Sequence, residues 1–324
     1  MQPDASGAWT AYNITDRTMS KYKIGIVPAA EDDSVCLMVI ASLEEPQMTD
    51  LFVPVLYASQ ERIERLREGR ESDTRFTFIP GAEQAKTECV CVVDSSHAAV
   101  AEGEENAAPA LPAWQADLQS GVIDALVFVG DADMDTCTTD AKAVVYLSAS
   151  DCMILVGREH IDEEMERTVK LLERDLDFSR PRMAVVADTD RQKEEWEAKA
   201  EELRAFLYGP FLTETFFEED QQEHYDVLLA FDHASARRCF REAAHAWGVC
   251  LTEDPEGRIT LYPAYNTQPM GEDATSFNTL SFNHALYSAV DVLRSRERYD
   301  EGHISPLPKL FFERKDERRG GNIE

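Results

Sequence analysis

Long apolar runs are missing from this sequence of 324 residues. No window approaches the roughly 20 consecutive apolar residues that a membrane-spanning helix requires. The opening stretch MQPDASGAWTAYNITDRTMS also lacks the basic and then apolar order of a secretory signal peptide. We therefore expect a cytoplasmic protein that does not enter the membrane.

Basic residues are scarce relative to acidic ones. The chain has 32 Lys and Arg against 62 Asp and Glu, which gives a formal net charge of −30. Such a chain repels phosphate backbones and anionic lipid, because binding to either depends on clustered Lys and Arg. The composition therefore predicts neither nucleic acid nor a membrane surface as a partner.

Cysteine is sparse and odd in number. Most of the seven cysteines lie within apolar runs, where a free thiol behaves as a small buried hydrophobe. The one close pair, Cys89 and Cys91, has C-x-C spacing in a strand-like run, and no second pair completes a zinc site. We expect no disulfide framework.

Glycine-rich phosphate motifs are also lacking. No GxGxxG, GxxxxGK[ST] or GxSxG occurs, so the sequence supports neither a dinucleotide turn, a P-loop nor a hydrolase elbow. An acidic stretch with Asp131 and Asp133 has the D-x-D-x-D opening of a calcium loop. That motif requires Gly and Glu where this chain has Thr136 and Lys142. The pattern favours a solvated acidic loop over a calcium site.

What the sequence does contain is an alternation of short apolar runs and helical stripes. Strands are predicted at 23–27, 52–57, 74–79, 89–93, 123–129, 143–147, 152–156, 183–187, 227–231, 249–252 and 258–261. Helices are predicted at 34–43, 59–68, 114–120, 162–177, 191–207, 235–247 and 281–296. This order predicts an α/β fold with parallel-dominated sheets flanked by helices.

The same alternation, broken near Asp131, predicts two α/β lobes with a cleft between them. We expect a flexible tail at 1–20, a first lobe at 21–130 that is completed by the last helix at 281–310, and a second lobe at 131–280. The end of the chain, 311–324, is expected to fray, and 94–112 is expected to form a mobile acidic loop.

His233 is the candidate functional residue that stands out from the pattern alone. It follows the unbroken apolar run 227–231, and ligands of open α/β sheets bind outside the carboxyl ends of the strands. A histidine that only caps a loop or bonds a carbonyl fits the same position, because imidazole suits many roles. The local pattern leaves both readings open.

Several sequence blocks together resemble one family, the NAD- and divalent-metal-dependent 4-hydroxythreonine-4-phosphate dehydrogenases of pyridoxal phosphate biosynthesis. The blocks are KIGI, PVLYAS, GVIDALV, CMILVG, RPRMAVVA, YDVLLAFDH and ALYSAVDVLRSR, spread over about residues 23–296. The resemblance implies a two-lobed fold like that of isocitrate and isopropylmalate dehydrogenases, with an interlobe cleft. It also implies a homodimer with its active site in that cleft, near the partner subunit.

The chain departs from this family at the residues that carry the chemistry. Where the family has the glycine-rich loop GDPAGIGPE this chain has PAAEDDSV, and where it has TAPINK, with a phosphate-binding lysine, this chain has FVGDAD. The stretch that corresponds to the family's PGHTE metal motif contains no histidine. The family has a second metal histidine, and His160 is the one remnant of it in this chain. Only His233 matches a metal histidine of the family, in YDVLLAFDH.

The later family block RTSPAHGTA is represented here by TLYPAYNTQ, in which Thr267 survives. The candidate cofactor-binding residues are Thr267, Asp273 and Ser276. For a metal, His233 is the matched ligand, and His160, Asp131, Asp133 and Asp232 are further candidates.

The departures predict a catalytically reduced relative that serves as a binding or regulatory protein, with no tightly bound cofactor. A single histidine falls short of the three protein ligands such metal sites use. The alternative is an active NAD- and metal-dependent oxidoreductase on a small phosphorylated hydroxy acid, with carboxylates replacing the lost histidines. Expected partners are a second copy of the chain and a small-molecule or protein ligand.

Overall fold

The computed structural model describes most of the chain between residues 21 and 304. The described ranges are 21–29, 33–95, 111–130, 141–148, 152–156, 170–177, 181–194, 207–218, 220–230, 232–243, 247–264 and 279–304. The predictions for the two tails lie outside these ranges, as does most of the predicted mobile loop 94–112.

The strands form along nearly every predicted apolar run. They are β1 (Lys23–Pro28), β2 (Val53–Tyr57), β3 (Phe76–Ile79), β4 (Val90–Val93), β5 (Ala125–Val129), β6 (Ala143–Ser148), β7 (Met153–Val156), β8 (Met183–Ala187), β9 (Leu207–Leu212), β10 (Val227–Ala230), β11 (Gly248–Glu253) and β12 (Ile259–Pro263). The helices are α2 (Asp33–Leu43), α3 (Pro46–Leu51), α4 (Gln60–Arg67), α5 (Ala113–Ser120), α9 (Thr213–Glu218), α10 (His233–Ala243) and α11 (Thr279–Ile304). Two short 3-10 turns, η1 (Ala82–Gln84) and η2 (Gln221–His224), complete the set.

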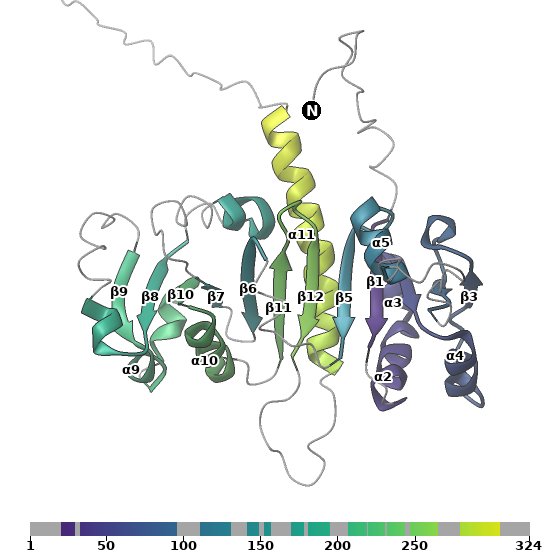
Figure 1. Ribbon diagram of the computed structural model, residues 1–324, viewed down its shortest axis with the longest axis horizontal. Coiled ribbons are helices and arrows are strands. Elements are labelled where there is room, and N and C mark those ends of the chain that lie inside the picture. The colour runs from purple at the N-terminus through teal and green to yellow at the C-terminus, as the bar shows by residue number, and fades with distance from the viewer. Residues whose placement is uncertain are drawn as a thin grey trace, which may run out of the picture.

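All of these strands belong to one sheet of 12 strands, in the order β3-β4-β2-β1-β5-β12-β11-β6-β7-β10-β8-β9 (Figure 1). Their pairings are parallel except for β11 with β12, β11 with β6, and β6 with β7. The predicted α/β class with a mainly parallel arrangement is confirmed. The two predicted lobes contribute to one continuous sheet rather than to separate ones, because β12 pairs with β5 in the register Ile259 to Ala125.

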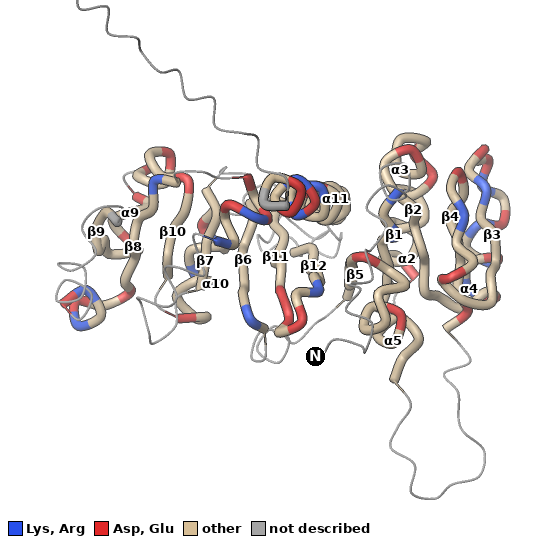
Figure 2. The backbone as a smooth tube through the Cα atoms, turned by 90° about the horizontal axis from the view of Figure 1, so that it is seen from above, with Lys and Arg blue, Asp and Glu red and all other residues tan. Residues whose placement is uncertain are grey.

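Helices cover both faces of this sheet. Residues of α2, α3, α11 and the helical stretch 170–176 pack in one cluster with one face of the strands, and α9 and α10 pack on the other. Seen from above, α3 and α11 lie on one side of the sheet and α5 on the opposite side (Figure 2). In β10, Val227 and Leu229 face the first cluster, whereas Leu228 and Ala230 face α10. A strand covered on both faces is apolar throughout, which is why β10 was recognisable from its sequence.

Two helix ends follow local chemistry. The side chain of Ser59 accepts a hydrogen bond from the Arg62 N–H at 3.5 Å and caps α4. Gly69, two residues after the last residue of α4, has a left-handed φ of 78°. Gly121 ends α5 with a φ of 74°, and its N–H donates to the carbonyls of Asp117 and Leu118. Glycine suits both positions because a Cβ disfavours positive φ.

The structure corrects the prediction between residues 191 and 218. The predicted helix 191–207 is helical over the described residues up to Glu194, but Leu207 begins strand β9, which pairs with β8 from Met183 onward. A short helix, α9, follows where no element was predicted. Pairing with β8 is a tertiary contact, so the apolar spacing around Leu207 did not reveal it.

Smaller differences concern element ends. Pro46 lies beyond the end of α2 and opens a short helix that was not predicted, α3, at a position proline favours because it has no N–H to leave unbonded. The last helix is longer than predicted and reaches Ile304. Among the described residues, no helix combines the length and apolar character needed to cross a membrane.

Candidate functional site

His233 lies just past the carboxyl end of β10, in the first turn of α10. The sequence suggested a loop here and a helix that begins at Ser235, but the helix starts two residues earlier. The side chain is partly buried, and its Nδ1 atom has almost no solvent contact. The imidazole is therefore held against the protein at the edge of the sheet.

Asp232, one of the candidate metal ligands, acts as the N-terminal cap of α10. Its Oδ1 accepts the Ser235 N–H at 2.8 Å, and its carbonyl accepts the Ala236 N–H at 2.9 Å. Asp is a favoured cap because its carboxylate satisfies an N–H that the first helical turn leaves without a partner. This carboxylate has a structural role beside His233.

A second carboxylate at this edge, among the described residues, is Asp188, which follows β8. Its Oδ1 accepts the Thr213 hydroxyl at 2.8 Å, and Arg238 of α10 lies 3.7 Å away. The Thr213 hydroxyl also lies 3.1 Å from the Ala187 carbonyl, which ties α9 to β8. Among the described residues, no group of three His, Cys, Asp or Glu side chains is placed to hold a metal.

Strands β5 and β10 run in opposite directions, so their carboxyl ends point to opposite ends of the strands in the sheet. Three antiparallel pairs lie between them, β12 with β11, β11 with β6 and β6 with β7, whereas β5 with β12 and β7 with β10 are parallel. The two strands are five inter-strand steps apart in the sheet order, roughly 24 Å at ~4.8 Å per step. Val129 and His233 therefore lie far apart within one chain.

Most of the other sequence candidates fall outside the described residues. These are the metal candidates His160, Asp131 and Asp133 and the cofactor candidates Thr267, Asp273 and Ser276. Of the proposed site, the structure thus places His233 and Asp232, which are neighbours at the start of α10.

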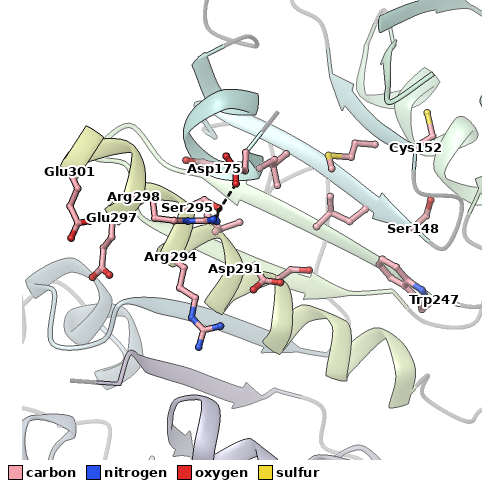
Figure 3. Close-up of a pocket in the computed structure, with 16 residues that line it drawn as sticks. Ser148, Cys152, Asp175, Trp247, Asp291, Arg294, Ser295, Glu297, Arg298 and Glu301 are labelled. Atoms are coloured by element: carbon pink, nitrogen blue, oxygen red, sulfur yellow. Dashed lines mark hydrogen bonds and ion pairs between the residues drawn. The ribbon is translucent and has the colours of Figure 1, made fainter. Parts of the chain in front are cut away.

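A large hollow lies elsewhere, between α11 and the second half of the sheet. It is a cavity of about 850 Å³ bordered by β6, β7, the stretch 175–177 and α11 (Figure 3). Its lining mixes apolar and charged groups, including Leu147, Met153, Trp247, Asp291 and Arg298. These residues come from the ranges predicted for both lobes, because α11 was assigned to the first lobe and the rest to the second.

One end of the cavity carries an aromatic stack. The rings of Trp247 and His284 are nearly parallel, 3.8 Å apart at an angle of 9°, and Tyr287 meets His284 edge-on. Burial lowers the pKa of His284, so the imidazole beneath Trp247 is held neutral around physiological pH. The stack holds the indole of Trp247, which lies at one end of the group of lining residues in Figure 3.

Asp175, one of the residues that line the cavity, belongs to a buried network of ion pairs. Arg174 and Arg296 both bind Asp175, and both also reach Glu253, at 2.6 and 3.3 Å. The Asp175 and Glu253 side chains are only 1% and 2% exposed. Burial by itself would raise the pKa of Asp175, but the hydrogen bonds from Arg174 and Arg296 outweigh burial and lower it.

This network joins the helical stretch 170–176, the end of β11 and the middle of α11. Lys142, which precedes β6, adds a cation 3.7 Å from Glu253. The network was not predicted from the sequence, although Glu253 ends a buried strand, where a carboxylate requires a cation. The network therefore connects these three segments beside the cavity.

Comparison with known proteins gives a relationship over nearly the whole chain. No family model matches. A curated 4-hydroxythreonine-4-phosphate dehydrogenase from Bacteroides thetaiotaomicron is 23% identical over 353 aligned positions, which cover 92% of this chain and 96% of that protein.

Solved structures of similar fold carry the same name. The enzyme from Burkholderia phymatum has a TM-score of 0.51 and 16% identity, over 84% of this chain and 98% of that one. The enzyme from Klebsiella pneumoniae has a TM-score of 0.52 and 16% identity, over 85% and 98%. The fold, the sequence comparison and the resemblance of the blocks agree: the chain is similar in sequence and in fold, at low identity, to 4-hydroxythreonine-4-phosphate dehydrogenases.

Proposed function

We propose that this chain keeps the dehydrogenase-like fold but has lost the metal-dependent oxidation, and that it acts as a binding or regulatory protein. The observation that carries the proposal is the role of Asp232. The carboxylate next to His233 caps α10 through the Ser235 N–H. It is thereby engaged in holding the helix rather than in completing a ligand set.

The donor set around His233 supports the same conclusion. Catalytic sites in which a divalent metal polarises an oxygen use about three protein ligands. At this edge of the sheet Asp232 caps α10, and Asp188 binds Thr213 and lies near Arg238. The described residues at this edge therefore do not fit a divalent metal.

The cavity beside α11 supports a binding role. Its volume of about 850 Å³ lies within the range of roughly 300–1,000 Å³ that is typical of small-molecule sites. Apolar groups such as Trp247 and Met153 lie on its wall together with charged groups such as Asp291 and Arg294. A ligand with an apolar part and a polar part matches this lining.

The competing proposal is an active NAD-dependent oxidoreductase on a small phosphorylated hydroxy acid, with carboxylates as metal ligands. Its candidate ligands are His233 with Asp131, Asp133 or Asp232. Carboxylates bind Mg²⁺ and Mn²⁺ well, so the chemistry of this alternative is sound.

One experiment separates the two proposals. The full-length protein is incubated with Mn²⁺ or Zn²⁺, desalted, and analysed for bound metal, and NADH formation is followed with 4-hydroxythreonine 4-phosphate and NAD. We expect no NADH above the protein-free blank, and bound metal that is equal in the wild type, His233→Ala and a control variant, His224→Ala. Stoichiometric metal that only His233→Ala removes, together with NADH formation, would establish the active enzyme instead.

The proposal includes a cytoplasmic location and a homodimer, and both rest on the family resemblance. Light scattering of the purified chain at micromolar concentration tests the homodimer directly. A mass that corresponds to one chain of 36.5 kDa would rule out the dimer.

A further inference from the structure

The cavity beside α11 carries more negative than positive charge. Two guanidinium groups line it, against five carboxylates, those of Asp175, Asp177, Asp291, Glu297 and Glu301. A hollow lined mainly by one sign of charge concentrates ligands of the opposite sign, and the formal charge of −30 on the chain acts in the same direction. The charge of the lining therefore favours a cation as the ligand.

Three of these carboxylates are already engaged within the protein. Asp175 belongs to the buried network of ion pairs. Asp177 pairs with Arg298 at 3.2 Å, and Glu297 accepts a hydrogen bond from the Tyr22 hydroxyl. Their charges are therefore matched before any ligand arrives.

Asp291 and Glu301 are the other two acidic residues of the lining. Both are exposed on α11, and within the described part of the chain neither makes a hydrogen bond or an ion pair. The second guanidinium, that of Arg294, acts elsewhere: burial and the hydrogen bond to Glu297 raise the pKa of Tyr22, and the nearby Arg294 opposes them. The lining therefore offers two carboxylates that a bound cation could pair with.

Asp291 lies on the same helix face as the residue that supports Trp247. His284, Ser288 and Asp291 follow one another at spacings of four and three residues, which places their side chains along one face of α11. The distance from His284 to Asp291 along the helix axis is roughly 10 Å, at ~1.5 Å per residue. Trp247 stacks on His284, and Figure 3 shows Asp291 between Trp247 and Glu301. An aromatic ring and an unpaired carboxylate thus lie within the length of one small molecule.

Apolar side chains accompany the indole at its end of the cavity. Strand β11 begins at Gly248, which pairs with Ser148 of β6, so Trp247 lies beside the end of β6. Leu147 of β6 and Met153 of β7 line the cavity together with Trp247. This end suits the apolar part of a ligand, and the face of an aromatic ring also attracts a cation.

The spacing of the carboxylates distinguishes an organic cation from a metal ion. Calcium requires about six to eight oxygen ligands around one point. In the part of the chain that the structure describes, no three His, Cys, Asp or Glu side chains converge in this way. An ammonium group can pair with a single carboxylate, which is what Asp291 provides.

We propose that this cavity binds an organic amine, with its ammonium group beside Asp291 and its aromatic or alkyl part against Trp247. The inference rests on the proposed function, because it names the class of ligand for the binding role. An ion pair with an exposed carboxylate changes affinity by about fivefold at most. The apolar contacts with Trp247 supply the remainder.

The test is calorimetric titration of the full-length protein, at low ionic strength, with three probes that carry a phenyl ring at the end of the same carbon chain. The probes are phenylbutylamine, phenylbutanol and phenylpentanoate, which present a positive, a neutral and a negative head group. We expect the amine to bind most tightly and the carboxylate most weakly. Added salt should weaken binding of the amine and leave that of the alcohol unchanged.

Two matched variants locate the ammonium group. Asp291→Asn should weaken binding of the amine about fivefold and leave that of the alcohol unchanged. Asp300→Asn is the control, because Asp300 is exposed on the same helix and does not line the cavity. Trp247→Leu should weaken binding of all three probes. Both aspartate variants should fold, since neither carboxylate has a partner among the described residues.

Several outcomes would overturn the inference. These are equal binding of the amine and the carboxylate, equal effects of Asp291→Asn and Asp300→Asn, or no binding of any probe. Preferred binding of phenylpentanoate that depends on Trp247 would overturn the choice of a cation and leave the binding role intact. Failure of the proposed function would appear separately, as NADH formation in the metal and NAD assay, which does not depend on Asp291 or Trp247.

Discussion

Arg296 and Asp175 form a two-pronged ion pair across 121 residues of sequence. Nε and Nη2 of the arginine donate to the two carboxylate oxygens at 2.9 and 2.8 Å. Such a fork matches guanidinium to carboxylate in geometry as well as charge. The pair attaches α11 to the helical stretch 170–176, which lies beneath the cavity.

Removal of this arginine should weaken the whole fold. Arg296→Ala leaves Asp175 with Arg174 as its remaining arginine partner, and breaking a buried pair typically costs about 3–5 kcal/mol. Urea unfolding followed by circular dichroism measures the loss. Arg298→Ala on the same helix is the control, because Arg298 and Asp177 are both well exposed and such pairs contribute at most about 1 kcal/mol. Equal effects of the two changes would contradict the structural role of the network.

The Asp175 carboxylate should make the free energy of unfolding depend on pH in the acidic range. Its pKa is lowered in the folded state, so its contribution is fully present above the unfolded pKa of about 3.9 and is lost as pH falls through the folded pKa. The groups that face it are Arg174 and Arg296, with Glu253 beyond them.

The corresponding variant is Asp175→Asn, which keeps the shape and removes the charge. We expect it to be less stable than the wild type at pH 7, and the difference to shrink once the pH falls below about 4. Urea unfolding at a series of pH values provides the measurement. A difference that is constant across this range would show that the charge of Asp175 does not cause the effect.

The cap of α10 should depend on an acceptor at position 232 and not on a charge. Asp232→Ala removes the acceptor for the Ser235 N–H and should cost about 1 kcal/mol of unfolding free energy. Asp232→Ser keeps an acceptor and should lose less. If Asp232 were a metal ligand, the serine variant would keep its stability but lose metal, so thermal unfolding with and without Mn²⁺ separates the two roles.

Gly121 should be needed for its backbone conformation alone. A Cβ built there meets nothing within 4 Å, so steric contact with other residues is not the obstacle. The positive φ disfavours side chains, and Gly121→Ala should therefore cost about 1 kcal/mol, whereas Gly121→Asn should cost less because Asn tolerates this region. Thermal unfolding of the two variants is the measurement, and a larger loss for Asn would contradict the explanation.

The strands and the long helices could be predicted from sequence because each depends on nearby residues. The run 227–231 is apolar at every position, so β10 had to be buried on both faces, and the stripe of the last helix recurs at three- and four-residue spacing. Strand β9 was missed because Leu207 also fits the apolar stripe of the helix predicted at 191–207, and only its pairing with β8 decides between them.

Of the candidate site, the sequence alone determined that His233 follows a buried strand and that, apart from His233, the blocks that resemble the family lack its metal histidines and its phosphate lysine. Tertiary structure decided the rest. It joined β12 to β5 in one sheet, placed the carboxyl ends of β5 and β10 at opposite edges, and assigned Asp232 to a helix cap. It also paired Arg296 with Asp175. Local periodicity carries no record of such contacts, because their partners are distant in the chain and meet only when the strands are ordered in the sheet.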